Sequence, residues 1–497
     1  MRALFTLIAL TLLLSLVPSS FSSGKAESAN IAYSDVLKMV LSTTCQNRKG
    51  WGGKCAPEPV KVQDASSGRE LTVMCPGCMK ALSIRGETLT GKLKVTESGK
   101  EREISFRSSA PSASELAEQV GKALGDYYTN HFFMQAARPR GLATDGKGNL
   151  LVTDFGTGQN DGKVWKISLS EFNRQPQLSQ PAEGTEFVSG MPSAKIDTSF
   201  QGQPIKSIVG LSSVRMDGAD LIALTNRIIA HGDKDPLAGL HEIPIASVLR
   251  INRGAPPRPK TSTGSLPQSL QPPQPIPFAV LSSLGDFEER FNPDKKEHEC
   301  DPFDFALRGG YAYVADSGGN DLVRVNTKTN EATLYAVFDE LPNALYDAQK
   351  PSGFQNRPKR DAVPMGVTFG PDGALYVALL GGFPFPKDGG AIYRLVDKND
   401  NGNALDPGEQ SVAVSGLTCA AGVAFDARGR MFTSEYSLDF AKNAPGRICL
   451  IREGKCAVTI TDKVISPTSI IVIGDYIYFS QEFMGLVGRL PLPKPDK

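Results

Sequence analysis

Residues 364–377 read Pro364-Met-Gly-Val-Thr-Phe-Gly-Pro-Asp-Gly-Ala-Leu-Tyr-Val377, and a similar phrase occurs six times in this chain of 497 residues. Each copy has an entry residue that is often Pro, an apolar run, a polar turn, a second apolar run, a loop and a third strand-like run. The copies are Pro139–Ile167, Val209–Ile251, Pro302–Val325, Pro364–Leu395, Ala421–Leu450 and Pro467–Leu490. A repeat of this length, built from short strands, is typical of propeller blades.

A fourth strand-like run precedes the next entry in five of the copies. These runs are Glu186–Val188, Phe278–Leu281, Thr333–Phe338, Ser411–Val414 and Cys456–Ile460. The sixth copy lacks such a run, and a strand from before Arg138 would complete it and close the ring. We therefore predict an all-β fold, a six-bladed β-propeller over residues 136–494, with an extended Pro-rich insertion at residues 254–277.

The N-terminal part of the chain does not follow the repeat. Residues 1–24 have a short charged head, an apolar core and a small-residue end, which predicts a secretory signal peptide. Residues 25–135 combine helix-like stretches with β-like runs at Glu70–Met74, Lys92–Thr96 and Glu103–Phe106. We predict a small α+β appendage here, on a protein exported to the periplasm or the extracellular space.

Charge and hydropathy limit the partners. The net charge of +1 gives no electrostatic reason to expect nucleic acid. No stretch beyond the leader approaches the roughly 20 apolar residues of a membrane span. The expected partner is a small molecule or another protein, and we expect the chain to be a monomer.

Export makes the eight cysteines candidates for disulfides. Cys449 and Cys456 flank a short turn, which predicts a cross-strand disulfide. Cys75 and Cys78, with Cys45 and Cys55 upstream, have three interpretations: structural disulfides, a zinc knuckle or a redox dithiol. The pairing of Cys300 and Cys419 stays open.

The fourth copy resembles the ScyD/ScyE family, exported NHL-like propellers named for their place in scytonemin pigment clusters. The specific part is Gly382-Phe-Pro-Phe-Pro386 after a strand, and the phrases Pro139-Arg-Gly-Leu-Ala143 and Val188-Ser-Gly-Met-Pro192 are similar to that family's first blade. The resemblance covers about residues 137–490 and implies a fold and an exported location. It implies no catalytic residues.

Loops of equivalent position in different blades converge around the channel of a propeller. The residues in those loops are Arg140, Asp154, Asn226, His231, Asp301, Asp304, Asp316, Asn320, Asp321, Phe383, Phe385, Glu435, Tyr436, Asp439, Glu482 and Phe483. This rim is acidic and aromatic, which is typical of a site for a cation, a metal-bridged ligand or an aromatic small molecule.

Seven residues of this rim are the predicted ligand site: Asp154, Asp301, Asp316, Phe383, Phe385, Glu435 and Glu482. The competing interpretation is structural, because aspartates such as Asp154 and Asp316 often cap tight turns.

The stretch Asp397–Glu409 resembles the start of a calcium-binding loop, with Gly402 at its sixth position. The candidate calcium ligands are Asp397, Asn399, Asn401, Asp406 and Glu409. The loop departs from the EF-hand pattern because Glu409 is thirteenth where the twelfth position is expected. The alternative is a surface hairpin held by its own Asx turns.

The sequence contains no Gly-x-Ser-x-Gly, no His-Glu-x-x-His and no phosphate loop, and its four histidines leave little for His-based catalysis. We therefore expect an exported binding protein, an accessory in a secondary-metabolite pathway of the scytonemin kind. The alternative is a propeller enzyme, either a metal-dependent lactonase or hydrolase or a quinoprotein dehydrogenase.

Overall fold

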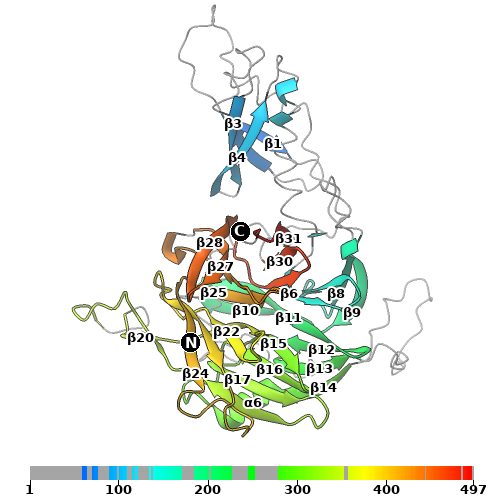
Figure 1. Ribbon diagram of the computed structural model, residues 1–497, viewed down its shortest axis with the longest axis vertical. Helices are drawn as coiled ribbons and strands as arrows, with labels where there is room; N and C mark the ends of the chain where they lie inside the picture. Colours follow the sequence, from blue (N-terminus) through cyan, green and yellow to red (C-terminus); the bar gives the residue numbers. More distant parts are fainter. Residues whose placement is uncertain are drawn as a thin grey trace, which may run out of the picture. The chain divides into compact units, whose positions relative to one another are not determined.

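The computed structural model describes residues 59–63, 70–75, 89–97, 100–108, 115–117, 119–120, 134–135, 138–170, 184–200, 203–226, 245–251, 278–351, 356–442, 444–482 and 485–494. The predicted leader, the Pro-rich insertion, Cys45, Cys55, Cys78, His231 and Phe483 lie outside these residues. The described part is almost entirely β, arranged in antiparallel sheets (Figure 1). No helix in it is long and apolar enough to cross a membrane.

Six sheets follow one another along the larger of two compact units, which contains residues 136–170 and 184–497. The first contains β6 (Pro139–Thr144), β7 (Asn149–Asp154), β8 (Gly162–Ser168) and β9 (Thr185–Met191). The second contains β10 (Ser193–Phe200), β11 (Gln203–Asp217), β12 (Asp220–Thr225), β13 (Ser247–Ile251) and β14 (Phe278–Ser283). The third contains β15 (Pro302–Arg308), β16 (Tyr311–Asp316), β17 (Asp321–Asn326) and β18 (Ala332–Val337).

The fourth sheet contains β21 (Pro364–Phe369), β22 (Leu375–Leu379), β23 (Gly390–Leu395) and β24 (Gln410–Leu417). The fifth contains β25 (Ala420–Phe425), β26 (Met431–Glu435), β27 (Gly446–Arg452) and β28 (Lys455–Val464). The sixth has the order β29 (Ile470–Ile473), β30 (Tyr476–Gln481), β31 (Leu486–Pro491) and β5 (Met134–Gln135). Its outer strand therefore comes from before Arg138, where the sequence indicated that a completing strand would be found.

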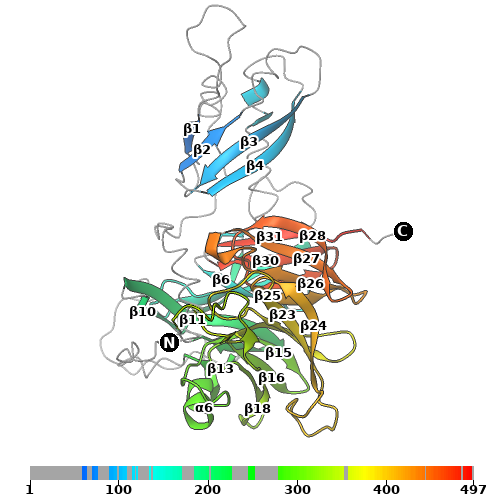
Figure 2. The same ribbon diagram turned by 90° about the vertical axis from the view of Figure 1, so that its left-hand side faces the viewer.

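Strands are counted from the innermost one, so β11 is the first strand and β12 the second strand of the second sheet, and β10 is an additional strand paired with β11. The first strands of the six sheets contact one another in a closed cycle. Strand β6 contacts β11, β11 contacts β15, β15 contacts β21, β21 contacts β25, β25 contacts β29, and β29 contacts β6 again. In both views the last sheet (red) lies beside the first (cyan) (Figures 1 and 2). Sheets whose first strands form a closed cycle in this way form a fold of the β-propeller kind.

The core is divided between the sheets. Apolar clusters join each sheet to the next from the first to the sixth; Leu151 and Leu221, for example, share the cluster between the first and second sheets. Alternate residues of each strand point to opposite faces of its sheet, so each sheet can contribute to the clusters on both sides. The apolar runs that the sequence repeats are the strands that supply these clusters.

Some elements were not expected from the sequence. A helix, α6 (Leu284–Phe291), follows the second sheet, with Ser283 as its N-cap. Strand β10 makes the second sheet five-stranded, and β19 (Leu341–Pro342) and β20 (Lys359–Arg360) form a two-stranded ribbon in the polar segment that precedes the fourth sheet. A short 3₁₀ helix, η2 (Phe440–Lys442), follows β26.

The smaller unit contains its own antiparallel sheet, described here by itself. The strands are β1 (Val60–Gln63), β2 (Glu70–Met74), β3 (Leu89–Glu97) and β4 (Lys100–Ser108), in that order. Three of them cover the β-like runs expected in the appendage. Val73, Leu93 and Val95 are buried on this sheet, as its alternating pattern requires.

Candidate functional site

Each first strand from the first sheet to the fifth has a β-bulge at the same place. The register shifts after Pro139, Leu211, Pro302, Pro364 and Ala420. A bulge leaves one residue of the strand without a partner and re-aims its side chain. The residues that occupy this position are Arg140, Ser212, Phe303, Met365 and Ala421.

The bulge residues gather where the first strands meet. The guanidinium carbon of Arg140 lies 4.6 Å from the ring centroid of Phe303, and Phe303 shares an apolar cluster with Met365 and Ala421. Glycine follows the bulge residue at Gly141 and Gly366. A Cβ at either position would lie 2.6 Å from a carbonyl oxygen of the neighbouring first strand, so the sheets approach this closely only without a side chain there.

A second repeated feature is a hydrogen bond between the segments that form the first two strands of a sheet. It is formed by a polar residue that ends the second strand or directly follows it. In five of the six sheets its side-chain oxygen accepts a hydrogen bond from a backbone N–H at or just ahead of the first strand. The pairs are Asp154 with Arg138 (2.8 Å), Asn226 with Gly210 (2.9 Å), Asp316 with Asp301 (2.7 Å), Glu435 with Thr418 (2.6 Å) and Gln481 with Ile465. Because neutral amides do this as well as carboxylates, the bond has a structural role that does not depend on charge.

Three members of the predicted site belong to this structural set. Asp154 also accepts a hydrogen bond from Nε1 of Trp165 at 3.0 Å. Asp316 accepts the N–H groups of Gly318 and Gly319 in the turn that follows it. Burial raises the pKa of Glu435, although the N–H of Thr418 and the charge of Arg447 oppose that rise. The carboxylates of Asp154, Asp316 and Glu435 therefore bind backbone N–H groups at the ends of strands. This favours the structural interpretation of these three residues over a role in binding a ligand.

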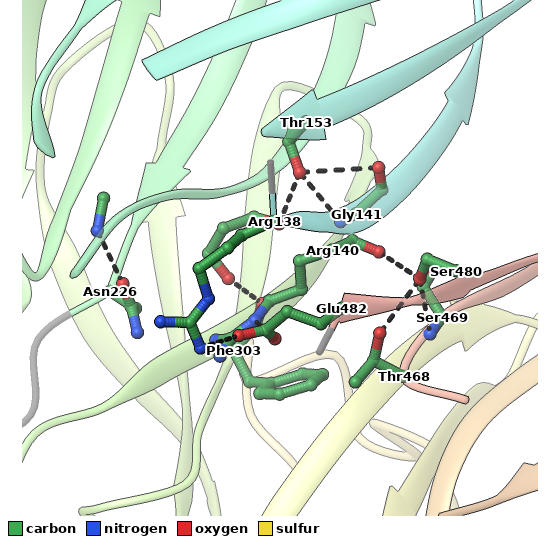
Figure 3. A network of polar contacts seen from close by, with 12 residues as sticks. Arg138, Arg140, Gly141, Thr153, Asn226, Phe303, Thr468, Ser469, Ser480 and Glu482 are labelled. Carbon is green, nitrogen blue, oxygen red and sulfur yellow. Dashed lines mark hydrogen bonds and ion pairs between the residues drawn. The ribbon is translucent and has the colours of Figure 1, made fainter. Parts of the chain in front are cut away.

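Glu482 and Arg140 form the centre of a different network (Figure 3). The Glu482 carboxylate accepts hydrogen bonds from Nη2 of Arg138 at 2.8 Å and from Nε of Arg140 at 2.7 Å. Burial alone would raise the pKa of Glu482, but the charges and hydrogen bonds of Arg140 and Arg138 lower it below its ordinary value. Two guanidinium groups therefore share one carboxylate within ion-pairing distance.

Aromatic rings lie on both sides of the Arg140 guanidinium. Its central carbon is 4.7 Å from the ring centroid of Phe155 and 4.6 Å from that of Phe303. The residue is 3% exposed, and its Nη1 has no hydrogen-bond partner among the described residues. A buried donor without a partner loses its interaction with water and gains nothing in exchange, so Nη1 is able to receive an acceptor from a ligand.

Burial also changes the pKa of Asp301, another residue of the predicted site. Burial raises the pKa of Asp301 to about 8, Arg140 opposes the rise, and Asp316 and Glu482 add to it. Asn226 donates to its Oδ1 at 3.4 Å. At neutral pH this carboxyl is largely protonated, so it adds little negative charge beside Arg140.

Phe383 and Phe385 pack among other apolar side chains. Phe385 is 4% exposed, and its ring centroid is 4.3 Å from that of Phe440 on η2. Both phenylalanines belong to the cluster that contains Phe303 and Tyr436. The Phe-Pro-Phe-Pro segment therefore supplies an apolar wall beside the bulge residues.

The structure thus divides the seven predicted residues into three groups. Asp301 and Glu482 meet around Arg140, Phe383 and Phe385 pack in the adjacent apolar cluster, and Asp154, Asp316 and Glu435 cap their own strands. Sequence reasoning missed Arg138 and the bulge residue Phe303. One signal was available: Gln481, not Glu482, occupies the repeated capping position, which marks Glu482 as an acid outside the repeat.

The loop Asp397–Glu409 connects β23 to β24 and brings most of its candidate calcium ligands together. Asp397 accepts the N–H groups of Asn401 and Gly402, and Oδ2 of Asp406 accepts from the side-chain amides of Asn399 (2.7 Å) and Asn401 (3.0 Å). Glu409 instead caps the loop ends through the N–H groups of Lys398 and Asp406. Calcium binding at this loop stays a prediction.

Cys449 and Cys456 are free thiols in the structure, and their sulfur atoms and a carboxylate oxygen of Glu435 lie within 4.8 Å of one another. Their disulfide stays a prediction. Cys456 is opposite Ile451, and Cys449 is opposite Thr459, so the two cysteines are not a directly facing pair. Cys300 and Cys419 are also thiols, whereas Cys75 is disulfide-bonded.

Comparison with known proteins yields fold similarities only. No family model matches the sequence, and no curated protein matches it. Among solved structures, the chain is similar to a catalytically inactive virginiamycin B lyase from Staphylococcus aureus with quinupristin, at 14% identity, covering 72% of this chain and 95% of the lyase, with a TM-score of 0.37. The resemblance to the ScyD/ScyE family stays a resemblance of motifs.

Two further solved structures are similar. A nidogen/laminin complex matches at 12% identity over 67% of this chain and 87% of that chain, with a TM-score of 0.36. A PQQ-bound aldose sugar dehydrogenase from Streptomyces coelicolor matches at 15% identity over 73% of this chain and 80% of that chain, with a TM-score of 0.28. At such scores none of the three assigns an activity to this chain.

Proposed function

We propose that this chain is an exported, six-bladed β-propeller that binds a small organic ligand at the Arg140 network. The six sheets in a closed cycle support the blade count, and the N-terminal sequence supports export. The resemblance to the ScyD/ScyE family supports a place as an accessory in a secondary-metabolite pathway of the scytonemin kind.

One observation carries the ligand proposal: Nη1 of Arg140 is buried and has no hydrogen-bond partner among the described residues. Arg138 and Arg140 share Glu482, and Asp301, with a pKa of about 8, is mostly neutral. This balance favours a ligand with an anionic or carbonyl oxygen over the cation that the acidic composition of the rim indicated. The rings of Phe155 and Phe303 favour an aromatic body next to that oxygen.

The metal-dependent lactonase alternative receives less support from the same residues. The carboxylates of Asp154, Glu435 and Glu482 already accept hydrogen bonds from backbone, indole or guanidinium groups. A divalent ion at the ring centre would have to displace those donors. Binding of an organic acid requires no such displacement, because it uses a donor that has no partner.

Calorimetric titration with matched probes tests this proposal. Indole-3-acetate and 4-hydroxyphenylacetate supply a carboxylate on an aromatic ring, and indole-3-ethanol and 4-hydroxyphenethyl alcohol are the same molecules with an alcohol in its place. We expect the acids to bind more tightly than the alcohols, and Arg140→Met to remove the difference. Loss of one hydrogen bond to a charged group corresponds to about 1.5–3 kcal/mol.

Arg308→Met is the matched control, because Arg308 also stacks on an aromatic ring, that of Phe369 at 3.8 Å, but lies at the surface. It should leave the binding of all four probes unchanged. Equal affinity for acids and alcohols, or equal loss in both variants, would contradict a guanidinium-dependent site.

A further inference from the structure

Two buried carboxyl groups lie close together beside the third sheet, outside the proposed ligand site. Glu288 lies on α6 and is 2% exposed, and Asp321 begins β17 and is 1% exposed. Among the described residues, neither forms an ion pair. Buried carboxylates in proteins are normally paired or bound to a metal ion, so this arrangement requires an explanation.

The fold holds both groups firmly in place. Leu284 and Phe287 of α6 pack in the apolar cluster between the second and third sheets, which turns the neighbouring Glu288 toward the protein interior. Asp321 is paired with Asp316 across the hairpin of β16 and β17. Helix α6 lies beside this part of the molecule in both ribbon views (Figures 1 and 2).

Three carboxylate oxygens at this place have no hydrogen-bond partner among the described residues. They are Oε1 of Glu288 and both oxygens of Asp321. This observation is independent of the clustering of acids, because Asp316 is just as buried and yet accepts three backbone N–H groups. The oxygens of Asp321 and Glu288 are therefore the ones that still lack a positive partner.

The backbone of Gly319 lies close to both carboxyl groups. A Cβ built on Gly319 would lie 3.2 Å from Oε2 of Glu288 and 3.3 Å from Oδ2 of Asp321, and its third nearest neighbour is also an atom of the Asp321 carboxyl. Gly319 is absent from the residues with positive φ, so its backbone does not require glycine. The missing side chain is instead explained by crowding, because a Cβ there would press against both carboxyl groups.

The electrostatic surroundings are negative. Burial raises the pKa of Glu288 to about 8, and Asp316, Asp294, Glu289 and Glu299 add to the rise. Burial, Asp316, Glu288 and Asp294 raise the pKa of Asp321 well above its ordinary value. The ammonium group of Lys296, a cation close to Asp294, lies 2.9 Å from Asp361 and 3.3 Å from Glu340 and is engaged with them.

We propose that Glu288 and Asp321 hold a hard divalent cation, of the calcium class, between their carboxyl groups beside Gly319. The donors are all carboxylate oxygens, which calcium prefers and which soft metals do not. Backbone carbonyls and water commonly complete the coordination of such an ion when only two carboxylates are present. The ion would supply the positive charge that the described residues do not, and would fix α6 against β17.

The test uses calcium alone as the probe, in full-length chain from which divalent ions have been removed by a chelator. Asp397→Asn with Asp406→Asn first removes the candidate loop site, so that any remaining calcium binding comes from elsewhere. In this background we expect one ion per chain by calorimetry and a rise of the thermal midpoint with added calcium. Glu288→Gln and Asp321→Asn should each weaken binding at least about 10–100-fold, the effect of losing even an outer partner of a metal site.

Two further variants keep the result decisive. Glu289→Gln is the matched control, since Glu289 is the next residue of α6 but its side chain is 64% exposed, and it should bind calcium normally. Gly319→Ala keeps both carboxyls but presses a methyl group against them, so it should weaken binding even if Glu288→Gln fails to fold.

The proposal is overturned if the Asp397→Asn, Asp406→Asn chain shows no heat of calcium binding and no rise of the thermal midpoint with calcium. It is also overturned if Gly319→Ala and Asp321→Asn bind calcium as tightly as the Asp397→Asn, Asp406→Asn chain does. In that case the carboxyl groups of Glu288 and Asp321 are simply protonated. Glu288→Gln would then stabilise the chain at pH 8. Arg140→Met leaves this site intact, so failure of the ligand proposal and failure of the cation proposal give different results.

Discussion

Replacing Glu482 by Gln removes the carboxylate that two arginines share. Arg140 is 3% exposed and lies between two aromatic rings, so its charge cannot be rehydrated where it stands. Asp301 also interacts electrostatically with Arg140, and its pKa of about 8 means that it must lose a proton before it can replace Glu482. We expect Glu482→Gln to lower the free energy of unfolding by about 3–5 kcal/mol, the cost of breaking a buried ion pair from one side.

Equilibrium urea unfolding measures this loss. Trp165 on β8 reports on the first sheet because its Nε1 binds Asp154, and Trp51→Phe as a common background removes the other tryptophan of the chain. The double variant Glu482→Gln with Arg140→Met removes both partners of the buried pair and should recover much of the loss.

Glu186→Gln is the matched control, because Glu186 pairs with Lys163 on the exposed part of the first sheet. Its cost should stay below about 1 kcal/mol, as for other surface ion pairs. If Glu482→Gln costs no more than Glu186→Gln, or if the double variant is less stable than either single variant, the reasoning about a desolvated charge at the ring centre is refuted.

Three more outcomes are expected, two from the structure and one from the sequence. Because the pKa of Asp301 is raised from 3.8 to about 8, its contribution to stability is complete below pH 4 and is lost as the pH rises through 8. Asp301→Asn should therefore make the decline of the unfolding free energy between pH 5 and 7 shallower by about 1.4 kcal/mol per pH unit. An unchanged slope would contradict the raised pKa of Asp301. Gly366→Ala should destabilise the chain by about 1–3 kcal/mol, because its Cβ would meet the carbonyl oxygen of Ala421 at 2.6 Å, and an unchanged urea midpoint would show that the sheets can separate. Mass mapping of exported protein without reductant should find Cys449 and Cys456 joined, and two free thiols would rule the disulfide out.

The repeat predicted most of the strand order because it is a local signal. An entry residue, two apolar runs and a turn fix a hairpin from neighbouring residues alone, and the first strands at Pro139, Pro302 and Pro364 begin where those phrases begin. Helix α6 was not predicted. It has only eight residues, and its apolar positions gain their meaning from the cluster between the second and third sheets.

The site was less predictable because its partners are remote in the sequence. Glu482 and Arg140 are 342 residues apart and meet only when the last sheet closes on the first. Capping acids such as Asp154 and Glu435 look the same in the sequence as a free acid such as Asp321. The difference between them is a backbone N–H supplied by the neighbouring strand, and register and bulge position decide whether that N–H points at the carboxylate.

The order of the sixth sheet has a consequence for the way the chain matures. Strand β5 comes from Met134–Gln135 and pairs with β31, which ends at Pro491, so one sheet contains both the first and the last segment of the ring. A ribosome or an export channel delivers these segments far apart in time, and loop closure over such a span is slow. Until the C-terminal strands emerge, the first and fifth sheets lack their shared neighbour, and β5 remains an unpaired edge open to other chains. Deletion of β31 should therefore affect the yield of folded protein far more than the loss of an equally long surface turn.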